Sequence, residues 1–265
     1  MGVWDVYEDR INNSGATKRE AFLKRERRTL NTKVKDSLSY QTVTVYTQDN
    51  SYNISSEEAQ KKSFIQDVSI INSDNLDEKT LFTLPGEDMD CGNIIFWDDN
   101  YWIVEEKDAN TTVYTKTKLR QCNHLLKWVD PESRQVIEQW CFIEDGTKYL
   151  TGELEDRKFI VTRGDSRIAM TITRNDMTVK FGRSNRFLID DPESPQKLAY
   201  LLTKPLKLAG VYNGKGYYKF VLQEVTSTQD DNQELGIAEY YKYFPTGEVV
   251  TPPETVPGTN KRMWL

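Results

Sequence analysis

The chain is poor in the residues on which most enzymes and metal proteins depend. Its 265 residues include a single histidine, His124, and three cysteines, Cys91, Cys122 and Cys141. The cysteines are too few for a disulfide framework, and none has the Cys-x₂-Cys spacing that places two zinc ligands on one turn. Free thiols of this kind are typical of proteins made in a reducing cytoplasm. Gly-x-Ser-x-Gly and Gly-x-Gly-x-x-Gly motifs are also missing. The sequence therefore predicts no metal, no organic cofactor and no enzymatic activity.

Long apolar runs and an excess of positive charge are missing too. No apolar stretch approaches the roughly 18 residues of a membrane-spanning helix, and the first ten residues lack the apolar core of a secretion signal. Lys and Arg total 35 against 41 Asp and Glu, which argues against a protein that binds nucleic acid over its whole surface. The balance is uneven, because residues 1–35 carry nine basic and five acidic side chains. We expect a basic arm on an acidic body, with no membrane partner.

The basic arm is predicted to contain a helix near residues 17–31. Thr17 and Glu20 have the spacing of a capping box, and strong helix formers follow. The apolar stripe of this helix is thin, so it has little reason to be stable alone and is expected to lie on another protein. The candidate docking residues in the arm are Lys18, Arg19, Phe22, Leu23, Arg25 and Arg28.

From Tyr40 onward, alternating β-branched and aromatic residues indicate strands. We expect the first strands at residues 40–47, 67–72, 79–84, 111–118, 124–129 and 136–143. Residues 93–104 predict a hairpin that turns at Asp98, Asp99 and Asn100. Residues 55–66 are ambiguous between a short helix capped by Ser55 and an inserted loop. The later block predicts strands at 158–163, 167–174, 178–181, 186–190, 206–211 and 217–225, with a short helix at 196–202.

The fold class is therefore mainly β: an N-terminal helix, two antiparallel β-barrel-like or sandwich-like domains and an extended C-terminal tail. The expected domains are a basic helical arm (1–36), a β-barrel-like domain (37–150), a second β-sandwich-like domain (151–245) and a Pro-rich tail (246–265). The tail ends in Met263, Trp264 and Leu265. Because these residues form an apolar tip, Trp264 and Leu265 are further candidate docking residues.

Two other function classes have some support in the residues. Trp97 and Trp102 share a hairpin, and such aromatic platforms can bind sugars, as in a carbohydrate-binding tail or baseplate protein. Large aromatic side chains of this kind more often pack in a protein core or a subunit interface. Carboxylate pairs such as Asp88 and Asp90 could serve a cell-wall hydrolase. Aspartates are, however, common in turns because they hydrogen-bond the local backbone.

Several stretches resemble virion structural proteins from the head–tail modules of tailed bacteriophages that infect Gram-positive bacteria. They are residues 69–78, 84–92, 101–102 with 121–128, 158–167 through 186–190, and 236–240. The likeness spans about residues 60–240 and is to the head-closure or head–tail connector proteins of the phage neck. It carries no catalytic residues and leaves the helix and the tail outside the matching part.

The resemblance implies an adaptor that forms a ring, of twelve copies to match the portal protein. Such a ring docks beneath the portal, helps to retain packaged DNA and attaches a downstream tail or tail-terminator protein. It implies assembly in the host cytoplasm and a final place in the neck of the virion. Packaged DNA would pass through the lumen without specific binding, which suits an acidic body.

Overall fold

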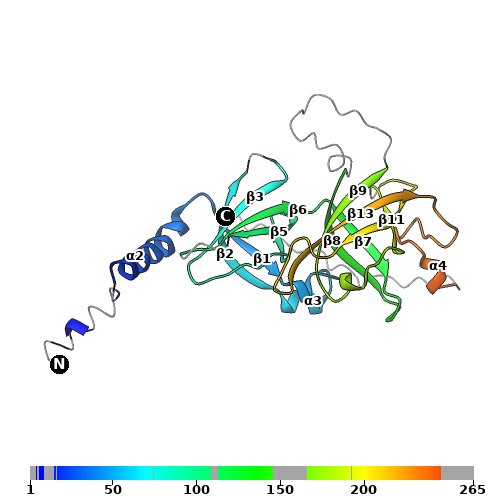
Figure 1. Cartoon of the computed structure of the whole chain (residues 1–265). Coiled ribbons are helices and arrows are strands. Elements are labelled where there is room, and N and C mark those ends of the chain that lie inside the picture. Colours follow the sequence, from blue (N-terminus) through cyan, green and yellow to red (C-terminus); the bar gives the residue numbers. More distant parts are fainter. Residues whose placement is uncertain are drawn as a thin grey trace.

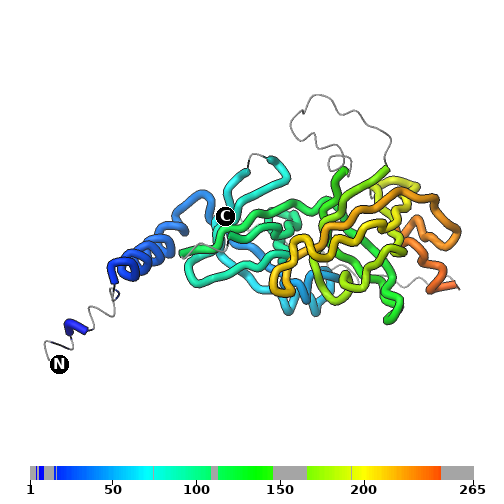
Figure 2. The backbone as a smooth tube through the Cα atoms, viewed as in Figure 1, coloured from blue at the N-terminus to red at the C-terminus, as the bar shows by residue number. Residues whose placement is uncertain are grey.

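The computed structural model describes residues 4, 6–8, 15, 17–73, 75–108, 113–145, 166–191 and 193–245. The protein is mainly β, with one N-terminal helix and two barrel-like sheets. Figure 1 shows the helix projecting from one end, followed by the first barrel and then the second sheet. The backbone trace in Figure 2 shows the two β units in contact along one side. The predicted tail at 246–265 lies outside the described residues.

Helix α2 (Lys18–Lys33) continues into the short 3₁₀ helix η1 (Val34–Asp36). Its predicted cap is confirmed, because the Thr17 side chain accepts a hydrogen bond of 3.2 Å from the backbone N–H of Glu20. None of its residues is buried, and only its C-terminal end meets the barrel (Figure 1). Among the described residues no helix is both long and apolar enough to cross a membrane.

The first barrel is closed, and its strands run in the order β1-β2-β3-β6-β5-β4 with antiparallel neighbours. The strands are β1 (Tyr40–Tyr46), β2 (Phe64–Asn72), β3 (Glu78–Thr83), β4 (Ile94–Trp97), β5 (Asn100–Asp108) and β6 (Lys116–Gln121). Between β1 and β2 lie the 3₁₀ helix η2 (Gln48–Asn50) and helix α3 (Glu57–Lys62). The alternating residues predicted for β1 point inward, and Val43 and Val45 are buried in the barrel core.

Two local predictions in this barrel can be compared with the structure. The hairpin turn has Asp98 at φ 51° and Asp99 at φ 59°, the left-handed conformation expected of a two-residue turn between β4 and β5. The ambiguous stretch at 55–66 does contain a helix, but Ser56 caps it in place of Ser55 by accepting a hydrogen bond from the N–H of Ala59.

The second sheet has seven strands in the order β10-β11-β13-β9-β8-β7, with β12 paired to β13. The strands are β7 (His124–Val129), β8 (Val136–Asp145), β9 (Arg167–Thr173), β10 (Arg186–Ile189), β11 (Leu198–Leu206), β12 (Val211–Tyr212) and β13 (Lys215–Val225). The 3₁₀ helix η4 (Thr178–Lys180) and helix α4 (Tyr240–Tyr243) complete it. The end strands β7 and β10 lie close together and share one core, to which Leu126, Trp128, Phe187 and Ile189 contribute. The sheet is therefore curled into a barrel-like shape.

Three predictions in this region are wrong. The helix expected at 196–202 is absent: β11 begins at Leu198, and Ala199 and Tyr200 are buried on its opposite faces as part of an apolar run. Residues 178–181 contain η4, where the buried hydroxyl of Thr178 donates to the carbonyl of Thr173 and closes a turn. The strand expected at 206–211 is instead the end of β11, a turn and the start of β12.

The partition of the chain also differs from the expected boundary at residue 150. Strands β7 and β8 (residues 124–145) pair within the second sheet, so that sheet begins directly after the first barrel ends at Gln121. The strand expected at 111–118 begins later, as β6. The strand expected at 158–163 lies outside the described residues.

Candidate docking surfaces and the junction between the barrels

A buried polar network joins the loop after β1 to the second sheet. The Asn175 side chain is 2% exposed, and its Nδ2 donates to Ser51 Oγ (2.9 Å) and to Gln139 Oε1 (2.8 Å). Its Oδ1 accepts from the backbone N–H groups of Met177 and Thr178. Every hydrogen-bonding group of this amide is satisfied, so the network holds the two units in one arrangement.

Apolar contacts cross the same junction. The ring of Tyr101 in β5 stacks on Trp140 in β8, with centroids 4.8 Å apart and planes 20° apart. Burial raises the pKa of Tyr101 to about 12, so its hydroxyl stays neutral. Nearby, the backbones of Gly92 and Gly216 touch: a Cβ at Gly92 would lie 1.9 Å from the Gly216 carbonyl oxygen. The two barrel-like units thus form one packed body.

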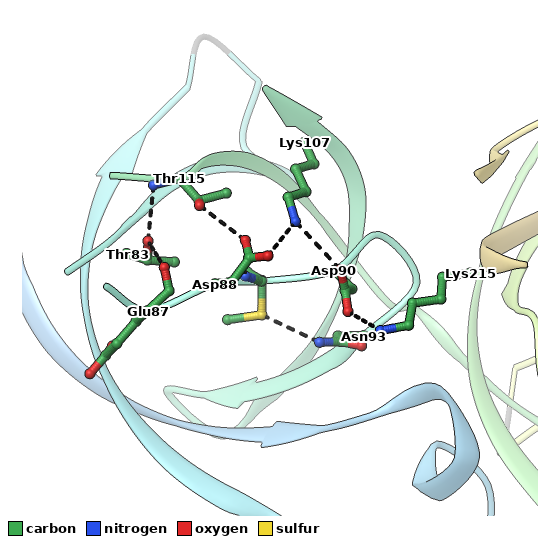
Figure 3. Close-up of polar contacts among 9 residues, drawn as sticks. Thr83, Glu87, Asp88, Asp90, Asn93, Lys107, Thr115 and Lys215 are labelled. Atoms are coloured by element: carbon green, nitrogen blue, oxygen red, sulfur yellow. Dashed lines mark hydrogen bonds and ion pairs between the residues drawn. The ribbon is translucent and has the colours of Figure 1, made fainter. Parts of the chain in front are cut away.

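The loop at residues 84–92 closes one end of the first barrel and reaches the second sheet (Figure 3). Met89 is buried in the barrel core at 1% exposure. Lys107 lies between two carboxylates, 2.7 Å from Asp88 Oδ2 and 3.4 Å from Asp90 Oδ1. Lys215, from the second sheet, lies 2.6 Å from Asp90 Oδ2. A chain of ion pairs therefore runs from the loop across the junction.

This geometry gives the carboxylate pair Asp88 and Asp90 a structural role. Partial burial by itself would raise the pKa of Asp88, but hydrogen bonds from Lys107, the Met89 N–H and Thr115 lower it below its ordinary value. A general acid needs the opposite shift. In the structure the residues of this loop hold the junction together.

The aromatic hairpin does not present an open platform. Trp102 is 3% exposed and belongs to the barrel core, with its ring centroid 5.9 Å from that of Trp97. The indole N–H of Trp97 lies 3.4 Å from Gln41 Oε1. On the second hairpin Tyr217 and Tyr218 are buried. A sugar could therefore stack on Trp102 only if the barrel opened.

The three cysteines are buried, and His124 is partly buried. Burial is the main cause that lowers the pKa of His124 to about 4, so the imidazole is neutral. All three cysteines are free, and Cys141 Sγ donates a 3.5 Å hydrogen bond to the His124 carbonyl. Burial raises the pKa of Cys122 and Cys141, which leaves both as unreactive thiols. Within the described ranges no three His, Cys, Asp or Glu side chains converge on a possible metal site.

The candidate docking residues of the arm all lie on α2. Phe22 is 60% exposed, Leu23 is half-buried, and the four basic members (Lys18, Arg19, Arg25 and Arg28) are exposed. The helix carries seven basic and two acidic side chains. The docking role of these residues stays a prediction, and Trp264 and Leu265 lie outside the described residues.

The structure has a hollow at the base of α2 that the sequence did not predict. It has a volume of about 200 Å³ and is lined by Leu30, Val34, Ser69, Phe82, Thr83, Leu84, Pro85 and Tyr114. Phe82 and Tyr114 meet edge to face with centroids 5.3 Å apart. The one sequence signal for it was Phe82, a large apolar residue on the outward-facing side of β3.

The comparisons with known proteins bear on the first half of the chain. Residues 21–121 match the YomX N-terminal domain. That stretch contains most of α2 and the whole first barrel. The family is of a Bacillus phage type, which is consistent with a phage origin for this chain. No curated protein matches the chain.

Two solved structures were also found. One is MrkH, described as a c-di-GMP-dependent transcription regulatory factor, with 8% identity and a TM-score of 0.22; the match covers 80% of this chain and 87% of MrkH. The other is the Bacillus subtilis inhibitor of motility MotI/DgrA, with 9% identity and a TM-score of 0.20, covering 74% and 92% of the two chains. Likenesses this low are no guide to the function of the chain.

Proposed function

We propose that this chain is a structural head–tail connector protein of a phage neck. Copies of it form a ring beneath the portal protein, help to retain packaged DNA and attach the tail or tail-terminator protein. The observation that carries this proposal is the exposed basic helix projecting from a packed two-barrel body, in a chain whose first barrel matches a phage-type family. Such a body suits a ring subunit, and such a helix suits contact with a neighbour.

The helix supports the proposal because none of its residues is buried against the described part of the chain. A helix of 16 residues is marginal in water unless an apolar face packs on something. The exposed ring of Phe22 beside half-buried Leu23 is the face available for that packing. The partner is a neighbouring subunit or the portal protein, and its surface should be acidic to match the helix.

The charge distribution favours protein docking over DNA binding. Residues 36–265 carry 26 basic and 36 acidic side chains, so the body repels a DNA backbone. Glu20 and Glu26 interrupt the basic face of α2. Such a body would let packaged DNA move through a ring without gripping its phosphates.

Light scattering and negative-stain imaging of the purified full-length protein test the ring. We expect an oligomer of ring shape, with twelve copies to match the portal. The double variant Arg25→Glu, Arg28→Glu should weaken this assembly, whereas the matched variant Arg183→Glu, Lys204→Glu, at exposed positions of the second sheet, should not. A protein that stays monomeric at every concentration, or two variants with equal effects, would count against the proposal.

Duplex-DNA binding at two salt concentrations tests the choice of partner. If α2 docks on protein, the full chain binds DNA weakly at both concentrations, and reversing Arg25 and Arg28 changes little. If α2 binds DNA, the affinity falls steeply with salt because each neutralised phosphate releases a counterion. Strong, salt-dependent affinity that disappears in a chain lacking residues 1–35 would overturn the docking role.

A further inference from the structure

The hollow at the base of α2 has the size of a single large side chain. Its volume of about 200 Å³ is below the range of about 300–1,000 Å³ typical of small-molecule sites. Leu30 and Val34 form the helix side, and Phe82, Leu84 and Tyr114 form much of the barrel side. An anchor that enters it would contact both the arm and the body.

The chain itself contains an anchor of matching chemistry. Beyond the described body lie residues 246–265, which contain Pro252, Pro253 and Pro257 and end in Met263, Trp264 and Leu265. A Trp side chain is the commonest kind of anchor at protein interfaces, because it buries a large apolar area and keeps one N–H for a hydrogen bond. Ser69 lines the hollow, and its hydroxyl, which shares a 2.7 Å hydrogen bond with Ser39, keeps a lone pair that can accept that bond.

Charge at the rim also matches the tail. Lys261 and Arg262 directly precede the apolar tip. Asp67 lies two residues before Ser69 in β2 and so shares its outward face. Glu87 follows the lining residues 84 and 85, and its backbone N–H donates to the Leu84 carbonyl at 3.1 Å. A basic pair next to the tip would therefore meet acidic groups next to the hollow.

The place where the described body ends favours a second copy of the chain as the donor. The described body ends at residue 245, close to α4, and Figure 1 shows α4 and α2 at opposite ends of the molecule. A contact between opposite ends of identical subunits is head-to-tail, and it closes into a ring when the rotation allows. We propose that the C-terminal tip of a second copy inserts Trp264 into the hollow between α2 and the first barrel. This inference rests on the proposed ring function and names one of its contacts.

Insertion of Trp264 into the hollow would also fix the position of α2 relative to the first barrel. Because Leu30 and Val34 line the hollow, a side chain that fills it packs the base of α2 against the barrel. The direction in which the arm projects would then depend on the neighbour's tail. The contact between the tail and the hollow would thereby orient α2 for its own contact with another subunit.

A peptide-binding measurement tests the contact without requiring rings. The acceptor is the full-length protein carrying Trp264→Ala, and the probe is a fluorescent peptide of residues 254–265. We expect saturable binding that weakens at least tenfold when the peptide carries Trp264→Ala or the acceptor also carries Leu30→Lys. Leu208→Lys, at an exposed apolar residue outside the hollow, should leave the affinity unchanged. No binding, or equal loss from Leu30→Lys and Leu208→Lys, would overturn the proposal.

Mixing two full-length variants decides between a neighbour's tip and the chain's own. Trp264→Ala protein has an intact hollow, and Leu30→Lys protein has an intact tip. If the contact is between copies, light scattering should show heterodimers only in the mixture. If the tip fills the hollow of its own chain, the mixture stays monomeric and the second-copy assignment is wrong. Rings formed by the Trp264→Ala protein would refute the tail contact but leave the connector proposal intact.

Discussion

The single histidine should make the stability of the protein depend on pH in a window that begins well above the titration range of ordinary carboxylates. His124 lies partly buried in β7, and its pKa is lowered from 6.5 to about 4, chiefly by removal of the ring from water. The charges of Lys127 and Lys197 lower it further, whereas the carboxylate of Asp190 raises it. In the unfolded chain the imidazole takes up a proton below pH 6.5, and in the folded chain it resists until about pH 4.

The sign and the size of the effect follow from that difference. Between the two pKa values the unfolded state binds more protons, so the free energy of unfolding falls as the pH falls. The contribution of His124 is full above pH 6.5 and is lost as the pH approaches 4. A difference of this size corresponds to about 3 kcal/mol in total, of which about 2.5 kcal/mol is lost by a pH of about 4.5.

Urea unfolding followed by tryptophan fluorescence at pH 7.5 and 4.5 measures the loss. His124→Gln removes the proton site and keeps a polar side chain, so its loss on acidification should be about 2.5 kcal/mol smaller than that of the wild type. Any packing cost of the variant is present at both pH values and cancels. Parallel curves for the wild type and His124→Gln would refute the reasoning.

The junction between the barrels makes two further predictions. Gly92→Ala should destabilise the protein by about 2 kcal/mol or more in urea unfolding, since its Cβ would overlap the Gly216 carbonyl. The control is Gly86→Ala, which has a similar positive φ but no atom within 4 Å and should cost clearly less. Equal costs for the two variants would contradict this reasoning. Asn175→Ala should lower the free energy of unfolding by about 3 kcal/mol, because it leaves Gln139 and other buried groups without their hydrogen-bond partners. Calorimetry should show a melting temperature lowered by about 2–4 °C per kcal/mol. An unchanged melting temperature would show that the network adds no stability.

Local signals account for the parts of the fold that could be predicted. The capping box of Thr17 and Glu20 marks the start of α2. It could be predicted because it spans only four residues and needs no tertiary partner. The turn at Asp98 and Asp99 is similarly local, since aspartate tolerates the left-handed conformation that joins β4 to β5. Both features were therefore readable from a short stretch of sequence.

Long-range pairing explains what could not be predicted. A helix was expected at residues 196–202, where strand β11 begins at Leu198. Burial on both faces of β11 removes the alternation that marks a strand. The early start of the second sheet depends on β8 pairing with β9 across more than 20 residues of intervening sequence. The hollow combines the end of a helix with the outside of a barrel, and no window of sequence contains both.

The extent of the family match suggests where the docking functions lie. The match spans residues 21–121, and the eight residues that line the hollow fall between Leu30 and Tyr114. Four of the six arm docking residues, Phe22, Leu23, Arg25 and Arg28, also fall within it. The first barrel has a core of its own, built around Val45, and needs the second sheet only at the junction. In the proposed ring, then, α2 and the first barrel contact the neighbouring copies. The second sheet separates them from residue 245, where the tail that contacts the next copy begins.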